Sequence, residues 1–268
     1  MELQSFQSSL GESDFNLQGR VENYLSYVLK DGTLKGNLDH QSAMINTNEL
    51  MQLTTEDTAS VKEDTTSMEL VIVPKNLDFT LNSQIDRLIY DKLVMNNTRG
   101  TVRITNGRVI LDGLRSGMLE GEMVVSGEYN TADTLNPYVD FDMALKSIDV
   151  NKATNSFSMV DSLMPIAKKA VGTVTTNLKF NSRMGRDMSL ILSSLNGGGL
   201  LESNGIEISG SSVQNSLATM LNNEKYRKAR AEDLSIDFKL ENGNVIVKPF
   251  TASIYGKQLT VSGVQGLD

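Results

Sequence analysis

Few side chains in this sequence could carry out chemistry. His40 is the only histidine among 268 residues, and there is no cysteine. A serine or cysteine hydrolase needs a base beside its nucleophile, and the sequence has neither a thiol nor a Gly-x-Ser-x-Gly motif. His40 follows a strand-like run at residues 35–39, so we interpret it as an exposed, non-catalytic residue. We predict no catalytic residues, and hydrolysis by Asp or Glu is the one enzymatic alternative that stays open.

Metal and phosphate motifs are also missing. One histidine and no cysteine exclude the common zinc spacings, and no Asp-x-Asp-x-Asp-Gly calcium loop occurs. Asp140 and Asp142 alternate with Phe141, which indicates one solvated strand face. Residues 196–199 are rich in glycine, but Leu200 follows where a phosphate loop continues with Gly-Lys-Ser/Thr. We therefore predict no metal and no cofactor.

Charge and hydropathy narrow the possible partners. With 33 acidic and 25 basic residues, the net charge is −8. This argues against nucleic acid and anionic headgroups, which cationic side chains bind, but it is compatible with an apolar ligand. No run of about 18 apolar residues is present, and the first residues do not have the pattern of a signal peptide. The basic cluster 225–230 is interpreted as a solvated helix end, with contact to a membrane surface as the alternative.

Alternation of apolar and polar residues predicts a β protein. Residues 101–111 and 236–247 share one form, an alternating run, Asn-Gly and a second alternating run. Asn-Gly in this setting is a strong hairpin signal because both residues tolerate positive φ. Further strands are expected at residues 14–20, 32–39, 76–81, 123–129, 139–145, 173–180, 188–192, 200–203, 205–209 and 259–263.

Three segments depart from this pattern. Residues 155–169 have apolar side chains at helical spacing, with Pro165 near the end. Residues 212–230 do so too, and either Ser211 or Ser212 is a suitable N-cap. Residues 54–68 are polar, so we expect a mobile loop there.

The sequence repeats itself. A shift of 136 positions aligns residues 101–127 with 237–263 without a gap, and a shift of 140 aligns 32–42 with 172–182. Repeats of this length suggest one extended β structure in which each unit covers the open edge of the last. We predict a disordered start at 1–13, a first β repeat unit at 14–135 and a second at 136–268.

The predicted fold is mainly β with two short helices. Tandem antiparallel β units form an extended, curled sheet with an open groove, and the helices cap it. The apolar strand faces must be buried, either around acyl chains in a trough or in a closed core, and the 13 methionines suit contact with variable apolar ligands. The groove candidates are Val102, Ile104, Val109, Leu111, Leu178, Phe180, Leu190, Leu192, Ile236, Phe238, Leu240, Val245, Val247, Leu259 and Val261.

Residues 73–127 and 195–268 resemble the AsmA family of bacterial envelope proteins. The motifs are a Gly-rich strand at 197–199, a short helix at 212–230 and the Asn242-Gly243 hairpin. An ending from Ser262-Gly263 to Leu267-Asp268 completes the pattern. The resemblance covers residues 14–268 and is greatest to Bacteroidetes-type sequences.

The resemblance implies a non-enzymatic protein of the cell envelope. Members are anchored in the inner membrane by an N-terminal helix, have a periplasmic body, and resemble bridge-like proteins that move lipid during outer-membrane biogenesis. The expected partners are a phospholipid or another acyl-chain lipid and envelope assembly proteins, without nucleic acid. Membrane association would use a segment absent from this chain. The alternative function is a structural or interaction module with a closed β core and no lipid.

Overall fold

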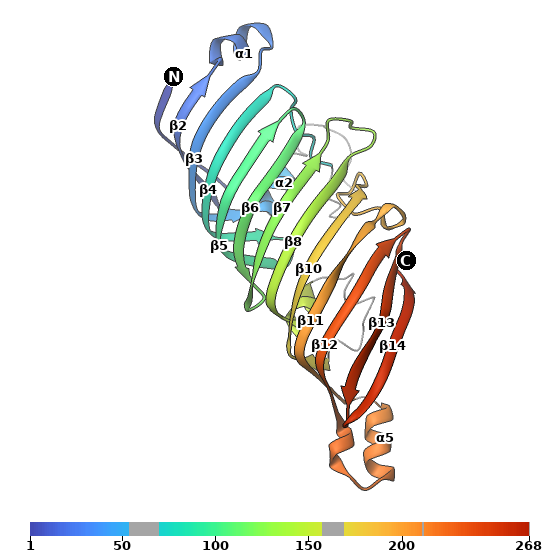
Figure 1. Ribbon diagram of the computed structural model, residues 1–268. Helices are drawn as coiled ribbons and strands as arrows, with labels where there is room; N and C mark the ends of the chain where they lie inside the picture. The colour runs from blue at the N-terminus through green and yellow to red at the C-terminus, as the bar shows by residue number, and fades with distance from the viewer. Residues whose placement is uncertain (54–69, 157–168, 211, 268) are drawn as a thin grey trace, which may run out of the picture. The chain divides into compact units, whose positions relative to one another are not determined.

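The computed structural model describes residues 1–53, 70–156, 169–210 and 212–267, and most of them lie in β-strands (Figure 1). The strands are β1 (Glu2–Leu10), β2 (Ser13–Glu22), β3 (Leu34–Asn46), β4 (Leu77–Tyr90), β5 (Leu93–Thr105), β6 (Arg108–Met118), β7 (Gly121–Asn130), β8 (Tyr138–Asp149), β9 (Ala170–Val171), β10 (Thr173–Arg183), β11 (Asn196–Ser209), β12 (Lys228–Glu241), β13 (Asn244–Ile254) and β14 (Lys257–Gly266). The predicted mainly β fold is confirmed.

The strands form a single open sheet. Their spatial order follows the sequence from β1 to β14, except that β9 lies off this path and pairs with β11. β1 and β14 are the two edges. β3 and β4 pair in parallel, which is an exception to the mostly antiparallel pairing that was predicted. A parallel neighbour requires a longer crossover connection, and here the connection contains α2 (Thr47–Leu53).

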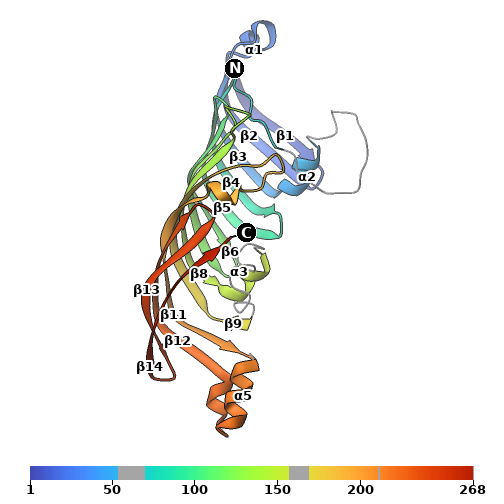
Figure 2. The same cartoon turned by 90° about the vertical axis from the view of Figure 1, so that its right-hand side faces the viewer.

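By contacts the chain divides into two compact units. Unit 1 is Met1–Met118, Met123–Asp142 and Asn181–Ile191, and unit 2 is Leu119–Glu122, Met143–Phe180 and Leu192–Asp268. In unit 1, strands β2 to β5 bend along their length, so their sheet is curled as predicted (Figure 2). This division follows contacts in space and not similarity in sequence. The predicted repeat boundary between residues 135 and 136 therefore stays a prediction.

The helices are short. They are α1 (Tyr24–Lys30), α2, α3 (Val150–Ser156), α5 (Ser212–Met220) and the 3-10 turns η2 (Leu192–Ser194) and η3 (Glu224–Arg227). The helix predicted at 155–169 and the loop predicted at 54–68 lie largely or wholly outside the described residues. α1, α2 and most of α3 were not predicted, because seven residues are too few for a clear helical period.

The helix predicted at 212–230 is wrong in its second half. α5 ends at Met220, and Asn222 adopts a φ of 47°. The Asn223 side chain then accepts a hydrogen bond from the backbone N–H of Lys225 and caps η3. Asparagine tolerates the left-handed conformation and favours caps. The Asn-Asn pair therefore ends the helix, and Lys228 already belongs to β12.

Two strand predictions also need correction. The start of the chain is ordered, because β1 pairs with β2 over Glu2–Leu10 although its side chains are almost all exposed. The strand expected at 188–192 is reduced to one bridge between Met184 and Leu190. Asp187 accepts hydrogen bonds from the backbone N–H and the hydroxyl of Ser189. These residues therefore form a tight turn and not a strand.

Candidate apolar binding surface

Two rows of apolar side chains cross β4, β5 and β6 in unit 1. The rows are Phe79–Ile104–Val109 and Leu81–Val102–Leu111. Residues directly opposite one another on neighbouring strands point to the same face, so all six side chains share one side of the sheet. Each is half-buried. We call these six residues the unit 1 rows; four of them were predicted groove residues, and Phe79 and Leu81 were not.

The other face of the same strands carries the charged side chains. Lys35 of β3 and Asp78 of β4 form an ion pair of 3.9 Å there. Arg103, between two row residues of β5, and Asp112, next to a row residue of β6, are exposed, whereas Ile110 of the same face is half-buried. Because successive side chains of a strand alternate between faces, the alternation that predicted these strands separates an apolar from a charged side.

The unit 1 rows occupy one end of their strands, and the opposite end is closed. There Ile85, Met95, Leu114 and Met118 are at most 9% exposed, and α2 packs against β4. Side chains buried to this degree resemble an ordinary protein core. The apolar face of unit 1 thus has a filled part and a part whose side chains keep access to solvent.

Unit 2 presents the same arrangement on β11, β12 and β13. Its rows are Leu201–Ile236, Phe238–Val247 and Leu240–Val245. All of these side chains are half-buried, and we call them the unit 2 rows. Phe238 lies opposite Gly199 of β11, where a Cβ atom would lie 2.2 Å from the backbone oxygen of Asn177 and 3.2 Å from the Phe238 ring. On the other face, Lys248 and Asp237 form an ion pair of 2.6 Å.

The remaining predicted groove residues have three different settings. Leu178 and Phe180 are half-buried on β10. Leu190 and Leu192 are half-buried too, but they lie outside regular strands, on the isolated bridge and in η2. Leu259 and Val261, on the edge strand β14, are 46% and 43% exposed. None of the predicted residues is fully buried.

His40 is buried, so its interpretation as an exposed residue is wrong. It lies on the apolar face of β3, is 8% exposed, and stacks on Phe15 with ring centroids 5.9 Å apart. Its Nδ1 is 3.3 Å from the Ser83 hydroxyl, and its Nε2 has no partner among the described residues. Burial lowers the pKa of His40, and the charge of Asp14 opposes this only in part. The ring thus packs between Phe15 of β2 and Ser83 of β4.

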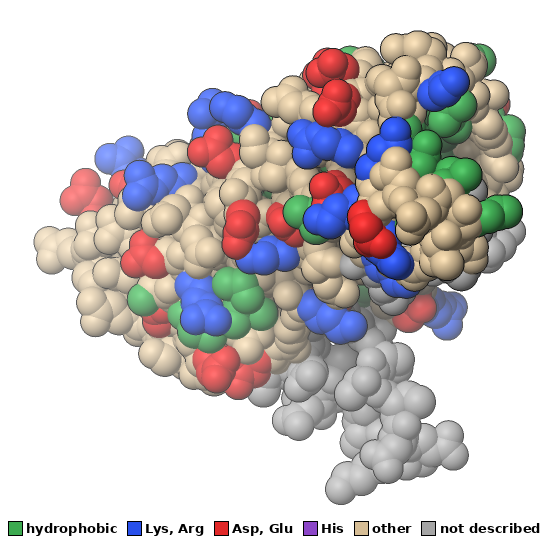
Figure 3. Space-filling view, turned by 90° about the horizontal axis from the view of Figure 1, so that it is seen from below, with side chains coloured by type: hydrophobic (Ala, Val, Ile, Leu, Met, Phe, Trp, Pro, Cys, Tyr) green, Lys and Arg blue, Asp and Glu red, His purple; other side chains and the backbone are tan. Residues whose placement is uncertain are grey.

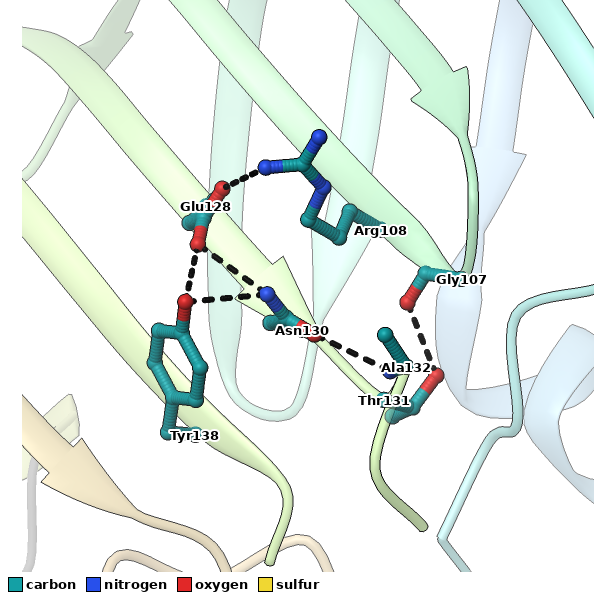
Figure 4. A network of polar contacts seen from close by, with 7 residues as sticks. All are labelled: Gly107, Arg108, Glu128, Asn130, Thr131, Ala132 and Tyr138. Atoms are coloured by element: carbon teal, nitrogen blue, oxygen red, sulfur yellow. Dashed lines mark hydrogen bonds and ion pairs between the residues drawn. The ribbon is translucent and has the colours of Figure 1, made fainter. Parts of the chain in front are cut away.

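A polar cluster in unit 1 joins neighbouring strands (Figure 4). The Tyr138 hydroxyl donates a hydrogen bond of 2.5 Å to Glu128, which also pairs with Arg108 at 3.5 Å and accepts from Asn130. Burial alone would raise the pKa of Glu128, but the hydrogen bonds from Tyr138 and Asn130 and the Arg108 charge together lower it. A general acid needs a raised pKa, so this carboxylate is suited to holding β6, β7 and β8 together.

The face shown in Figure 3 carries charges of both signs. In the view of Figure 3, Lys and Arg side chains lie among Asp and Glu side chains. In the basic cluster after α5, Lys228 pairs with Glu207 at 2.9 Å and Arg230 with Glu232 at 3.3 Å. Such pairing leaves little net charge to attract an anionic partner.

Among the described residues, no three His, Asp or Glu side chains are placed to hold a metal ion. No helix in the described ranges has both the length and the apolar character to cross a membrane. The chain matches no family model, no curated protein and no solved structure.

Proposed function

We propose that this protein binds or conducts lipid acyl chains on the apolar face of its sheet. In this proposal it is a non-enzymatic, periplasmic part of an inner-membrane-anchored envelope protein of the AsmA type that serves outer-membrane biogenesis. The observation that carries the proposal is the half-burial of the unit 1 and unit 2 rows. A protein core would bury such side chains completely, and a flexible apolar ligand would complete their burial.

Binding would be driven by the removal of apolar surface from water, at roughly 25 cal/mol per Å². The rows contain no charged side chain, so headgroup chemistry contributes little and several phospholipids would be accepted. Aliphatic and phenyl groups that are aligned across neighbouring strands offer a continuous strip for an extended chain. The charged side chains of the opposite face stay hydrated and keep the lipid-bound sheet in solution.

One observation favours the alternative, an interaction module without lipid. Ile85, Met95, Leu114 and Met118 show that part of the unit 1 face is a filled core. If a protein partner covers the rows, the chain would act as a docking element in envelope assembly. The two functions differ in whether lipid is bound to the purified chain.

Native mass spectrometry with lipid extraction from the same sample tests the proposal. We expect phospholipid at a fixed stoichiometry, and its loss in the variants Phe238→Asp and Val245→Asp. The matched control is Ile246→Asp, which changes a half-buried residue of the same strand on the opposite face and should keep the lipid. A lipid-free mass that does not change after incubation with liposomes would refute lipid binding and favour the interaction module. Equal retention in folded Phe238→Asp and Ile246→Asp would refute the proposed surface.

A further inference from the structure

Helix α1 is an apolar helix that is turned outward. Its large side chains Tyr24, Leu25, Val28 and Leu29 are 52%, 71%, 58% and 72% exposed, and the helix has no buried residue. A helix of a globular protein normally turns its apolar stripe to the core. Exposed apolar patches of this kind mark interaction sites.

The outward side of α1 lies opposite its two less exposed residues. Ser26 and Tyr27 are its shielded residues. The backbone N–H of Gly32 donates to the carbonyl of Ser26 at 3.0 Å, and the Ser26 hydroxyl lies close enough to meet a Cβ at position 32. These contacts cap the C-terminal end of α1, and the side that carries Ser26 and Tyr27 is the less exposed one. At about 100° per residue, the four exposed side chains cover an arc of roughly 140° on the side that faces away.

Both ends of α1 hold this orientation. Asn23 before the helix and Asp31 after it adopt the left-handed conformation, with φ of 61° and 50°. These residue types tolerate that conformation at single positions, and it turns the chain sharply at each end. α1 consequently projects past the ends of β2 and β3 (Figures 1 and 2).

The position of α1 within unit 1 is equally informative. β2 ends at Glu22 and β3 begins at Leu34, on either side of the helix. Leu34 pairs with Leu77 at the start of β4, two residues before Phe79. The unit 1 rows are therefore at the same end of the strands as α1, and the filled core is at the other end.

We propose that α1 docks unit 1 onto the surface of a lipid bilayer by inserting Tyr24, Leu25, Val28 and Leu29 into its interface. Interfacial helices lie in the plane of the bilayer surface and bury only their apolar side, to a depth of about 5–10 Å, and α1 presents one such side. Tyrosine beside aliphatic residues is typical of that zone because its ring is apolar and its hydroxyl is wet.

Charge favours a bilayer without net charge over an anionic surface. Glu22 and Asp31 flank the helix against Lys30 and Lys35, and Lys35 is already paired with Asp78. No cationic excess is left for anionic headgroups, so insertion must be driven by apolar area. A protein groove that receives a helix commonly uses anchors spaced over i, i+3, i+4 and i+7, which is more length than α1 offers.

This inference does not depend on lipid cargo. A chain without cargo would still dock through α1, and a chain with cargo would still carry it if α1 failed to insert. Vesicle binding and lipid retention are measured on the same protein by different readouts, so failure of one leaves the other standing.

The absence of tryptophan allows a direct test in the full chain. The variant Tyr24→Trp carries a single tryptophan in α1, and Tyr90→Trp carries one at the far end of β4, where Tyr90 is 45% exposed. With phosphatidylcholine vesicles that contain brominated acyl chains, we expect a blue shift and quenching for Tyr24→Trp and neither for Tyr90→Trp. Absence of quenching for Tyr24→Trp, or equal quenching for both, overturns the proposal.

A second pair of variants distinguishes apolar insertion of α1 from other ways of binding to vesicles. In vesicle flotation, Leu25→Ser combined with Leu29→Ser should lower partitioning about tenfold or more, because two leucine side chains no longer leave water. Leu135→Ser, at a loop leucine that is 83% exposed, should leave partitioning unchanged. Binding should persist at high salt. Loss of binding at high salt, an equal effect of Leu135→Ser, or self-association through α1 without vesicle binding would each overturn docking onto a bilayer.

Discussion

β7 and β14 come from equivalent places in the sequence repeat but differ in burial. The shift of 136 positions places Met123 and Val125 of β7 on Leu259 and Val261 of β14. Met123 and Val125 are 7% and 6% exposed, whereas Leu259 and Val261 are 46% and 43% exposed. β7 has a neighbour on each side, and β14 has only β13. The alternating pattern determines which face a residue takes, and the place of the strand in the sheet determines how far it is buried.

The hairpins that lead to these strands are alike. Asn106-Gly107 adopts φ of 48° and 77°, and Asn242-Gly243 adopts 50° and 75°. The backbone N–H of Thr131 donates to the carbonyl of Gly107 at 2.9 Å, and that of Leu267 donates to the carbonyl of Gly243 at 2.8 Å. Residues 131 and 267 are again 136 positions apart, so the equivalence reaches past the aligned segment. The difference in burial between β7 and β14 therefore does not come from local geometry.

The largest effect should come from a charge placed at the two equivalent valines. Val125→Asp buries an uncompensated carboxylate, and we expect it to lower the free energy of unfolding by about 3–5 kcal/mol or to prevent folding. Val261→Asp keeps its carboxylate hydrated on the edge strand and should cost less than about 1 kcal/mol. Urea denaturation followed by circular dichroism measures both. Similar losses would mean that β14 is covered in solution by something that buries it as β8 buries β7.

A smaller difference is expected between the two turn glycines. Gly107→Ala and Gly243→Ala both place a Cβ in the left-handed region, at a cost of roughly 1–2 kcal/mol. At Gly107 that Cβ would also lie 2.8 Å from the Cα of Ala132, whereas at Gly243 the nearest atom is 3.5 Å away. Thermal denaturation should therefore show a larger loss for Gly107→Ala. Equal losses of stability would mean that the loop after β7 moves to relieve the clash with Ala132, so that the clash adds nothing to the free energy lost.

Strands and turns were predicted from the sequence more accurately than the burial of their side chains and the pairing of the strands. Both Asn-Gly hairpins were predicted with their flanking strands, because the turn signal and the alternation are local. Most groove candidates lie on strands with half-buried side chains because they were chosen by alternation. Leu190 and Leu192 are half-buried but do not lie on a regular strand. The hydrogen bonds of Asp187 with Ser189 form a turn where the strand was predicted.

Features that depend on distant contacts were not predictable. His40 looked exposed because polar residues follow it, yet its burial comes from β2 and β4, which contribute Phe15 and Ser83. The parallel pairing of β3 with β4 depends on a crossover that the alternation does not report. α1 was overlooked because seven residues are too few to show a helical period.

The smallest effect concerns His40 and its counterpart in the second repeat. The shift of 140 positions places His40 of β3 on Phe180 of β10, so the second copy has a ring at this place that does not titrate. Burial lowers the pKa of His40 in the folded protein, and the unfolded chain then binds more protons as the pH falls below about 6.5. The free energy of unfolding should therefore decrease on acidification in that range. Asp14 and Glu128, whose folded pKa values are also lowered, lose their contribution only below about 4.5.

The substitution His40→Phe gives the first repeat the residue of the second and should remove this pH dependence. At pH 7 it has two opposing effects on stability, because it removes the Nε2 that has no partner among the described residues and also the Nδ1 that contacts the buried Ser83 hydroxyl. Urea denaturation of both proteins between pH 7 and pH 5 gives the difference attributable to His40. If both lose stability equally over that range, His40 is protonated as easily when folded as when unfolded. Its burial against Phe15 would then have no electrostatic cost, and the two repeats would be equivalent at this position in spite of their different rings.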